Sequence, residues 1–360
     1  MKIKTGLIGV CLLANSALFA DSTTITDALK NGKINGEFFL YAEQSDISGS
    51  DDEGYGSGSF NLGFTTDSLY GFTLDVGSRA NHAFWEIDGS EYTQSDKAIL
   101  HTANIAYSHP HLDVVLGRQR LNLVWAEDFH EALVGIVKAF PYTTITVGYT
   151  QRIATADGDQ PLRGFTKIGD SGAFVADLKY EGIEFLALNP YIYYADDVAA
   201  WAGAKADYDG NFGDFKIGGT LHYAISNEDN ASDGSFLQVE ARGTFGGVNA
   251  FLGFLKNDKD GGAGSIGALG DLDIFEDGEE IFEEIDAQTF YLGANGSWNR
   301  FKFSGVFGST EYEGGKMREL DLAIGYDLTN NLNLSAVFVN GNGEGDNDYN
   351  KLSAEVVYSF

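Results

Sequence analysis

The chain has 360 residues, of which 46 are glycine and four are proline, and its formal charge is −30. Acidic residues outnumber basic ones by 53 to 23, which argues against nucleic-acid binding because phosphate contacts need clustered lysine and arginine. The hydrophobic share of 43% is too high for a disordered chain. Abundant glycine, tyrosine and phenylalanine with little proline indicate many strands joined by turns rather than a helical enzyme.

The first twenty residues have the features of a secretory signal peptide. Lys2 and Lys4 precede an apolar run that ends at Phe19, and the small residue Ala20 offers a cleavage site before Asp21. The run is shorter than the roughly 20 apolar residues that a membrane-spanning helix needs. We therefore expect residues 1–20 to be removed on export.

The rest of the chain repeatedly alternates apolar with polar residues. Near the C-terminus, Leu352, Val356 and Phe360 share one face, whereas Ser353 and Glu355 share the other. The same alternation recurs in residues 215–226, 319–326 and 332–338. A period of two predicts strands with one face against an apolar medium and the other against water. That medium is a packed core in a soluble sandwich and lipid in a membrane barrel.

The lengths of the connections favour the membrane barrel. About eighteen strand-like segments follow residue 33, with sixteen as the alternative, and closed bacterial barrels have an even number. Short periplasmic turns opposite long external loops are typical of outer-membrane barrels. We expect an all-β, transmembrane, antiparallel barrel over residues 33–360, preceded by a short periplasmic segment at 21–32. Short links near residues 66–68, 109–111, 141–142, 181–182, 246–247, 299–300 and 329–331 alternate with longer polar links at 43–58, 81–97, 118–130, 155–171 and 257–286.

Three stretches carry a family resemblance. They are Asp27 to Lys33 at the opening of the first strand, Leu116 to Gln119 before the third long link, and residues 131–154. Through them the chain resembles the OprD-type outer-membrane porins, particularly the Opr-family porins of the epsilonproteobacterial kind. The resemblance implies an eighteen-stranded barrel, passive diffusion of solutes, and a constriction partly built by an inward-folded third loop.

The last residues resemble the general assembly signal of outer-membrane barrels. Tyr358 and the terminal Phe360 supply aromatic rings at alternate positions, with Glu355 where the pattern more often has glycine. The resemblance implies recognition by the barrel-assembly machinery and contact with outer-membrane lipids. It leaves a homotrimer open, because lipid-facing and subunit-facing surfaces look alike.

Charged residues near the third long link are the candidate pore constriction. Two arginines enter this link, acidic residues follow within it, and two further arginines end neighbouring strands on the parity that faces the lumen. Arginines facing carboxylates across a narrow pore create a transverse field that sorts ions. Ordinary loop charge is the alternative, and both interpretations stay open. The candidate residues are Arg79, Arg118, Arg120, Glu127, Asp128 and Arg152.

Signatures of catalysis or cofactor binding are weak. Gly262, Gly264 and Gly267 fit Gly-x-Gly-x-x-Gly, but they lie in an acidic link, and a dinucleotide site needs a strand before them and a helix after them. The same link holds Asp258 and Asp260, and its carboxylates could bind a divalent cation, although the spacing matches no EF-hand loop. We expect a protein that is not an enzyme and holds no cofactor, with Asp258 and Asp260 as a weak candidate metal site.

Two functions from different classes fit these features, and a third, a barrel-embedded lipid enzyme, is the least supported because the sequence has no catalytic signature. The first is a porin in the outer membrane of a Gram-negative bacterium, forming a water-filled channel for passive diffusion of small hydrophilic solutes and ions. The alternative is a barrel that acts as a surface adhesin or scaffold through its acidic external loops. Conductance of the purified protein in a planar bilayer separates the two.

Overall fold

The computed structural model describes residues 22–87, 97–261, 274–278, 284–343 and 348–360. The expected signal peptide lies outside this part of the chain. Helix α1 (Ile25–Lys30) opens the described region, and none of the helices described is long and apolar enough to cross a membrane. The Thr24 side chain caps α1 by accepting a hydrogen bond from the backbone N–H of Asp27 at 3.1 Å. The Ala28 carbonyl accepts the N–H of Asp67 at 2.9 Å, which ties α1 to the first turn between strands.

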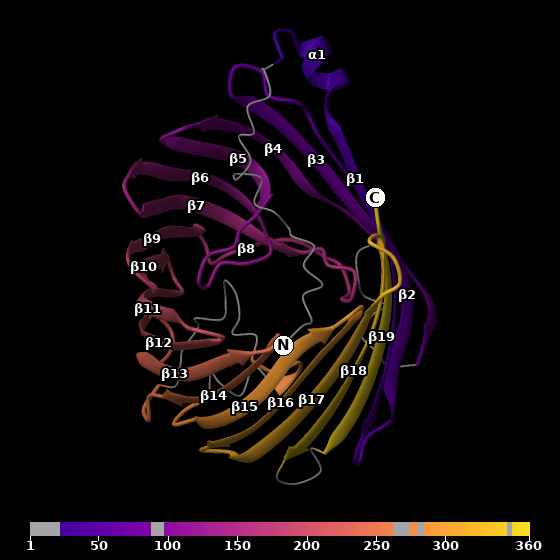
Figure 1. Ribbon diagram of the computed structural model, residues 1–360, viewed down its shortest axis with the longest axis vertical. Coiled ribbons are helices and arrows are strands. Elements are labelled where there is room, and N and C mark those ends of the chain that lie inside the picture. The colour runs from indigo at the N-terminus through magenta and orange to yellow at the C-terminus, as the bar shows by residue number, and fades with distance from the viewer. Residues whose placement is uncertain (1–21, 88–96, 262–273, 279–283, 344–347) are drawn as a thin grey trace.

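Nineteen strands follow, and eighteen of them close into one antiparallel barrel (Figure 1). Closure results because β1 pairs with both β2 and β19, and because β9 pairs with β7. The short strand β8 pairs with the end of β7 beyond the β9 contacts, so it is an addition to the barrel wall. The prediction of an eighteen-stranded barrel is therefore confirmed. The strands are β1 (Lys33–Ile47), β2 (Glu53–Thr65), β3 (Phe72–Glu86), β4 (Ala98–His109), β5 (Leu112–Arg120), β6 (Phe129–Phe140), β7 (Thr143–Thr155), β8 (Arg163–Lys167), β9 (Ala173–Ile183), β10 (Leu186–Ala195), β11 (Ala199–Phe212), β12 (Phe215–Glu228), β13 (Gly234–Phe245), β14 (Val248–Asn257), β15 (Gln288–Trp298), β16 (Phe301–Tyr312), β17 (Gly315–Asp327), β18 (Leu332–Gly343) and β19 (Tyr349–Ser359).

Side chains alternate between the outer face and the lumen along each strand. On β19, Leu352 is 59% exposed on the outer face, whereas Ser353 and Val357 are buried on the inner face. On β12, Leu221 is 52% exposed and its neighbour His222 is buried. These are the faces that the alternation predicts. A barrel whose exposed outer face is apolar is the arrangement of a membrane barrel and not of a soluble sandwich.

Connections at the two ends of the barrel differ in length. At the end that carries α1, called here the short-turn end, several pairs of strands are joined by two residues, as at 141–142, 246–247 and 299–300. At the other end, the long-loop end, the nine connections are L1 to L9 in chain order. L5 (196–198) and L8 (313–314) are brief, as the sequence also predicts. The three that matter for the lumen are L3 (121–128), L4 (156–172) and L7 (258–287).

Two predicted connections are wrong in position. The long link expected at 43–58 is only residues 48–52, because residues 43–47 belong to β1 and residues 53–58 belong to β2. The sequence places a turn at Glu181 and Gly182, but both lie in β9, and the chain reverses at residues 184–185. Phe185 takes the left-handed conformation there, with φ of 63°, which a phenylalanine seldom adopts. Gly182 instead leaves room for the ring of Tyr180, because a Cβ at this position would lie 2.3 Å from the Tyr180 hydroxyl. The glycine therefore marks a close approach inside a strand.

Aromatic side chains gather at the short-turn end on the outer face. Phe140, Tyr142 and Trp298 are 57%, 72% and 69% exposed there. Phe215 and Phe245 stack across neighbouring strands with ring centroids 4.6 Å apart. This distribution matches the aromatic girdle that borders the apolar band of membrane barrels.

Candidate pore constriction

Segments of three connections from the long-loop end lie against the inner face of the barrel wall, and they make the candidate constriction. They are L3, L4 and residues 274–278 of L7; L3 and L4 can be followed in Figure 1. L3 packs on the inner face of β10, β12 and β13. Its Trp125 is 2% exposed and donates from Nε1 to the Tyr191 hydroxyl at 2.5 Å. The Trp125 ring also lies 5.4 Å from the His222 ring and 5.3 Å from the Phe236 ring, centroid to centroid. These contacts hold L3 against the wall, as expected for an inward-folded third loop.

L4 crosses to a different part of the wall. The Asp159 carbonyl accepts a hydrogen bond from the Tyr55 hydroxyl on β2 at 2.8 Å, across 104 residues of sequence. Gly158 lies so close to the wall that an added Cβ would be 2.6 Å from the Phe39 ring and 2.8 Å from Arg79 Nη1. In Figure 1 the magenta segment after β7 accordingly reaches across the barrel toward β2 and β19.

L7 contributes a third inward segment, residues 274–278, of which Phe275 is 2% exposed. Its backbone is held by two carboxylates on β17: the N–H of Glu276 donates to Asp321 at 2.9 Å, and the N–H of Asp277 donates to Glu319 at 3.0 Å. The Asp277 carboxylate in turn forms an ion pair with Lys351 on β19. L7 is therefore attached to the wall formed by β17 and β19.

The candidate residue Arg79 is buried inside the barrel. It is 6% exposed, and its guanidinium lies 2.7 Å from the Glu37 carboxylate on β1 and 2.7 Å from the Ser59 hydroxyl on β2. Breaking a buried pair by removing one partner costs about 3–5 kcal/mol, because it leaves an uncompensated charge. This geometry gives Arg79 a bracing role between β1, β2 and β3.

Arg118 and Arg152 are brought together by one carboxylate, that of Glu131 on β6. The Arg118 Nη2 atom lies 2.8 Å from Glu131 Oε1, and the Arg152 Nε atom lies 3.7 Å from Glu131 Oε2. Arg118 also stacks over the Phe165 ring of β8, with its Cζ 4.3 Å from the ring centroid. These contacts fix both arginines to the β5–β7 wall.

Arg120 joins the two inward loops L3 and L4. Its Nη1 atom is 3.1 Å from Asp157 of L4, and its Nη2 atom is 4.0 Å from Asp128 of L3. Asp128 has a positive φ of 64° at the end of L3, a conformation that aspartate tolerates better than most residues. The backbone carbonyl of Glu127 faces His130 Nε2 at 2.5 Å. The candidate residues thus gather around L3 and L4, and each of the four arginines has a carboxylate beside it.

The structure adds residues that the sequence did not single out as part of a constriction. They come from L4, L7 and the wall of β1, β17 and β19, where carboxylates predominate. The alternation placed Lys351 and Glu355 on the inner face of β19 but gave no reason to choose them. The sequence did not predict the position of the L7 residues, because no local feature of an acidic link indicates that part of it lies inside the barrel. These added residues are Glu43, Asp159, Glu276, Asp277, Glu319, Asp321, Lys351 and Glu355.

The candidate metal residues lie in the described part of L7. Asp258 accepts the backbone N–H of Asp260 at 2.8 Å, and Asp260 pairs with Lys259 at 3.2 Å. Among the described residues, no three side chains of His, Cys, Asp or Glu are grouped so that they could hold a metal ion. The motif formed by Gly262, Gly264 and Gly267 lies outside the described residues.

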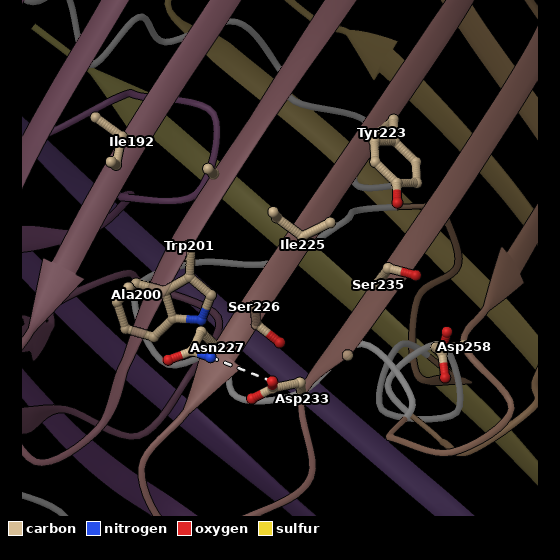
Figure 2. Close-up of a pocket in the computed structure, with 12 residues that line it drawn as sticks. Ile192, Ala200, Trp201, Tyr223, Ile225, Ser226, Asn227, Asp233, Ser235 and Asp258 are labelled. Atoms are coloured by element: carbon tan, nitrogen blue, oxygen red, sulfur yellow. Dashed lines mark hydrogen bonds between the residues drawn. The ribbon is translucent and has the colours of Figure 1, made fainter.

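A pocket of about 440 Å³ is present at the long-loop end of β10–β13 (Figure 2). Its lining includes the outward-facing Ile192, Tyr223 and Ile225, and at its polar edge Asn227 donates to Asp233 at 3.1 Å. None of the candidate constriction residues lines this pocket. The pocket is therefore separate from the candidate constriction.

The C-terminus completes the barrel at the short-turn end. Gly36 and Phe360 exchange backbone hydrogen bonds of 2.9 and 3.0 Å, so the last residue extends the pairing of β19 with β1. The Phe360 and Tyr358 rings are exposed on the outer face at 46% and 43%. An aromatic C-terminus is thus presented at the closing seam.

No protein-family model matches the chain, and no match is found among curated proteins. Solved structures do match over nearly the whole length. OccAB4 of Acinetobacter baumannii is 11% identical with a TM-score of 0.79, over 93% of this chain and 99% of that one. OpdO of Pseudomonas aeruginosa is 14% identical with a TM-score of 0.78, over 93% and 98%. OpdK of P. aeruginosa, solved with vanillate, is 15% identical with a TM-score of 0.75, over 92% and 99%. At these identities the likeness establishes a shared fold.

Proposed function

We propose that the chain is an outer-membrane porin of the OprD type, which forms a water-filled channel for passive diffusion of small hydrophilic solutes and ions. One observation carries the proposal. The closed barrel has an apolar outer face and an inner face with polar and charged side chains, against which L3, L4 and residues 274–278 of L7 lie. Such a lumen suits hydrated solutes, and the inward loops supply the charges that sort them.

The solute class follows from how the lumen charges are arranged. OpdK, an outer-membrane protein of P. aeruginosa with the same fold, has been solved with vanillate. In this chain the arginines of the candidate constriction already lie beside carboxylates of the protein. We therefore propose general diffusion with a weak preference for cations, and not a channel dedicated to carboxylates.

Localisation and partners follow from the same proposal. The barrel lies in the outer membrane of a Gram-negative bacterium, with lipids around its apolar face and the short-turn end toward the periplasm. The barrel-assembly machinery recognises the aromatic C-terminus. In the membrane, three copies of the barrel can associate as a homotrimer. We also propose that the chain is a porin of the epsilonproteobacterial kind and that it has no catalytic activity. Its signal peptide is cleaved after residue 20.

Conductance tests the proposal directly. Purified protein inserted into a planar bilayer should give stepwise, ohmic increases of current in simple salt solutions. An outer-membrane adhesin or scaffold with a closed lumen would insert without conducting. Insertion without current, verified by recovering the barrel from the bilayer lipid, would reject the porin and favour that alternative.

A further inference from the structure

The inner face of β19 carries a lysine that is enclosed by acidic groups. The Lys351 side chain is 14% exposed, and its ammonium group forms an ion pair with Asp277 of L7. Glu43 of β1 and Glu276 of L7 are also among its electrostatic neighbours. Lys351 therefore links the barrel wall to a loop segment that lies 74 residues away in sequence.

Strand pairing places one carboxylate, that of Glu43, diagonally across from this lysine, and a second, that of Glu355, four residues farther along the inner face of β19. Ser353 lies between Lys351 and Glu355 on the inner face of β19, and Glu43 of β1 is the direct cross-strand partner of Ser353. Diagonal neighbours in an antiparallel pair are about 7–8 Å apart, within the reach of long side chains. Glu43 is therefore within reach of both Lys351 and Glu355, whereas Lys351 and Glu355 lie about 13 Å apart along the strand. These three residues define one patch of the lumen wall.

L4 and L7 bring more negative charge to the same patch. Asp159 of L4 interacts electrostatically with both Glu43 and Glu355, and Glu276 of L7 interacts with Glu355. The patch thus combines one ammonium group with five carboxylates, those of Glu43, Asp159, Glu276, Asp277 and Glu355. The candidate arginines differ from Lys351 in this respect, because carboxylates balance them nearly one to one.

We propose that Lys351 is a specificity-determining residue of the lumen, whose ammonium group limits cation passage between β19, L4 and L7. The inference rests on the proposed porin function. A passing cation is attracted by the five carboxylates and repelled by Lys351, so the lysine sets how strongly this region favours cations over anions. Asp277 has the opposite effect on the same field, although it shares the ion pair with Lys351.

The expected effect is measurable. A unit charge about 4 Å from an ion in a water-like medium changes the local ion concentration about fivefold, and about twofold when the distance doubles. Salt screening acts over about 8 Å at physiological ionic strength. The charge of Lys351 acts with opposite sign on cations and anions, so removing it should raise the cation-to-anion permeability ratio by the square of this factor, about four- to 25-fold before salt screening.

Reversal potentials in a potassium chloride gradient, measured on the full barrel in planar bilayers, test the inference. Lys351→Gln should raise the cation-to-anion permeability ratio, Asp277→Asn should lower it, and the double variant should return close to wild type. Lys351→Arg, which keeps the charge, should also stay close to wild type. Lys316→Gln is the matched control, because it removes the same charge from a lysine that pairs with Glu311 of the neighbouring strand at the long-loop end. It should leave the permeability ratio close to wild type.

The opposite signs of the two single variants separate charge from structure. Lys351→Gln and Asp277→Asn break the same ion pair, so a purely structural tether would make both shift the ratio in the same direction. Such parallel shifts, or an unchanged ratio in Lys351→Gln, would overturn the inference while leaving a conducting porin. If Lys351→Gln fails to assemble, the test depends on Asp277→Asn. A cation-to-anion permeability ratio that does not fall in Asp277→Asn would also overturn the inference. A wild-type barrel that inserts without conducting would overturn the porin function itself.

Discussion

Replacing Leu252 with arginine tests whether the outer face of the barrel meets lipid. Leu252 lies on β14, is 64% exposed, and has Ala241 and Leu292 as its cross-strand partners on either side. An exposed position in a soluble protein accepts arginine at little cost. In the hydrocarbon layer the guanidinium loses its hydration, so the same substitution destabilises the barrel.

The magnitude depends on depth, and β14 contains its own control. Val248 is the first residue of β14, at the short-turn end, and it shares the outer face with Leu252 four residues later. A strand rises about 3.3 Å per residue and tilts by about 45°, which places Leu252 roughly 9 Å farther along the barrel axis. The apolar band is about 25 Å tall, so Leu252 lies near its middle and Val248 near its edge. We expect Leu252→Arg to lower the free energy of unfolding by about 2–4 kcal/mol and Val248→Arg by about 0–1 kcal/mol.

Urea unfolding of the protein refolded in lipid vesicles measures both values, with tryptophan fluorescence as the signal. The comparison uses one strand, one face and one introduced side chain, so depth is the main difference between the variants, beside the loss of a leucine in one and of a valine in the other. Equal losses at the two positions, or no loss at Leu252, would refute the reasoning and point to a face that is not covered by lipid.

Three further predictions concern assembly and the lumen. Deleting Phe360 should reduce the amount of folded barrel in the outer membrane without blocking export, as cell fractionation would measure; normal levels would contradict the assembly signal. The double variant Arg118→Gln/Arg120→Gln removes two positive charges beside Glu131 and Asp157, so reversal potentials should shift toward stronger cation preference; no shift would place these arginines outside the permeation path. Trp125→Ala removes the buried ring that holds L3, at a cost of about 3–5 kcal/mol for a buried tryptophan. Single-channel conductance should then rise, and an unchanged value would mean that L3 does not narrow the pore.

Alternation predicted which side chains face outward along the regular parts of the strands, because successive side chains of a strand point to opposite faces. Leu352 and Ser353 are adjacent in sequence and lie on opposite faces, as do Leu221 and His222. The alternation fails at bulges: Phe84 and Trp85 are adjacent and both exposed where the pairing of β2 with β3 is irregular. The strand number followed from the same pattern together with the alternation of short and long connections. These features repeat along the chain, so one misplaced strand boundary does not change the predicted architecture.

Parity did not predict how crowded the lumen is. Val357 lies on the inner face, where an open channel would tolerate almost any residue, yet it is 3% exposed and packs with Phe39, Tyr41 and Tyr55. A cluster of this kind depends on which side chains of β1, β2 and β19 meet at one height. The register that decides this is a property of the closed barrel, and a single strand does not contain it.

Charge pairing in the lumen was the least predictable feature, since the partners come from distant segments. Arg118 finds Glu131 across one strand pair, 13 residues away, but Arg120 meets Asp157 only because L4 turns inward, and Lys351 meets Asp277 only because L7 does. Counting the basic residues near L3 therefore overestimates the positive charge that a passing ion encounters. The inward loops add carboxylates to the very arginines and lysine that line the wall. We therefore expect the selectivity of the proposed channel to depend on the loops and the wall together, so a substitution on either side of these pairs should change it.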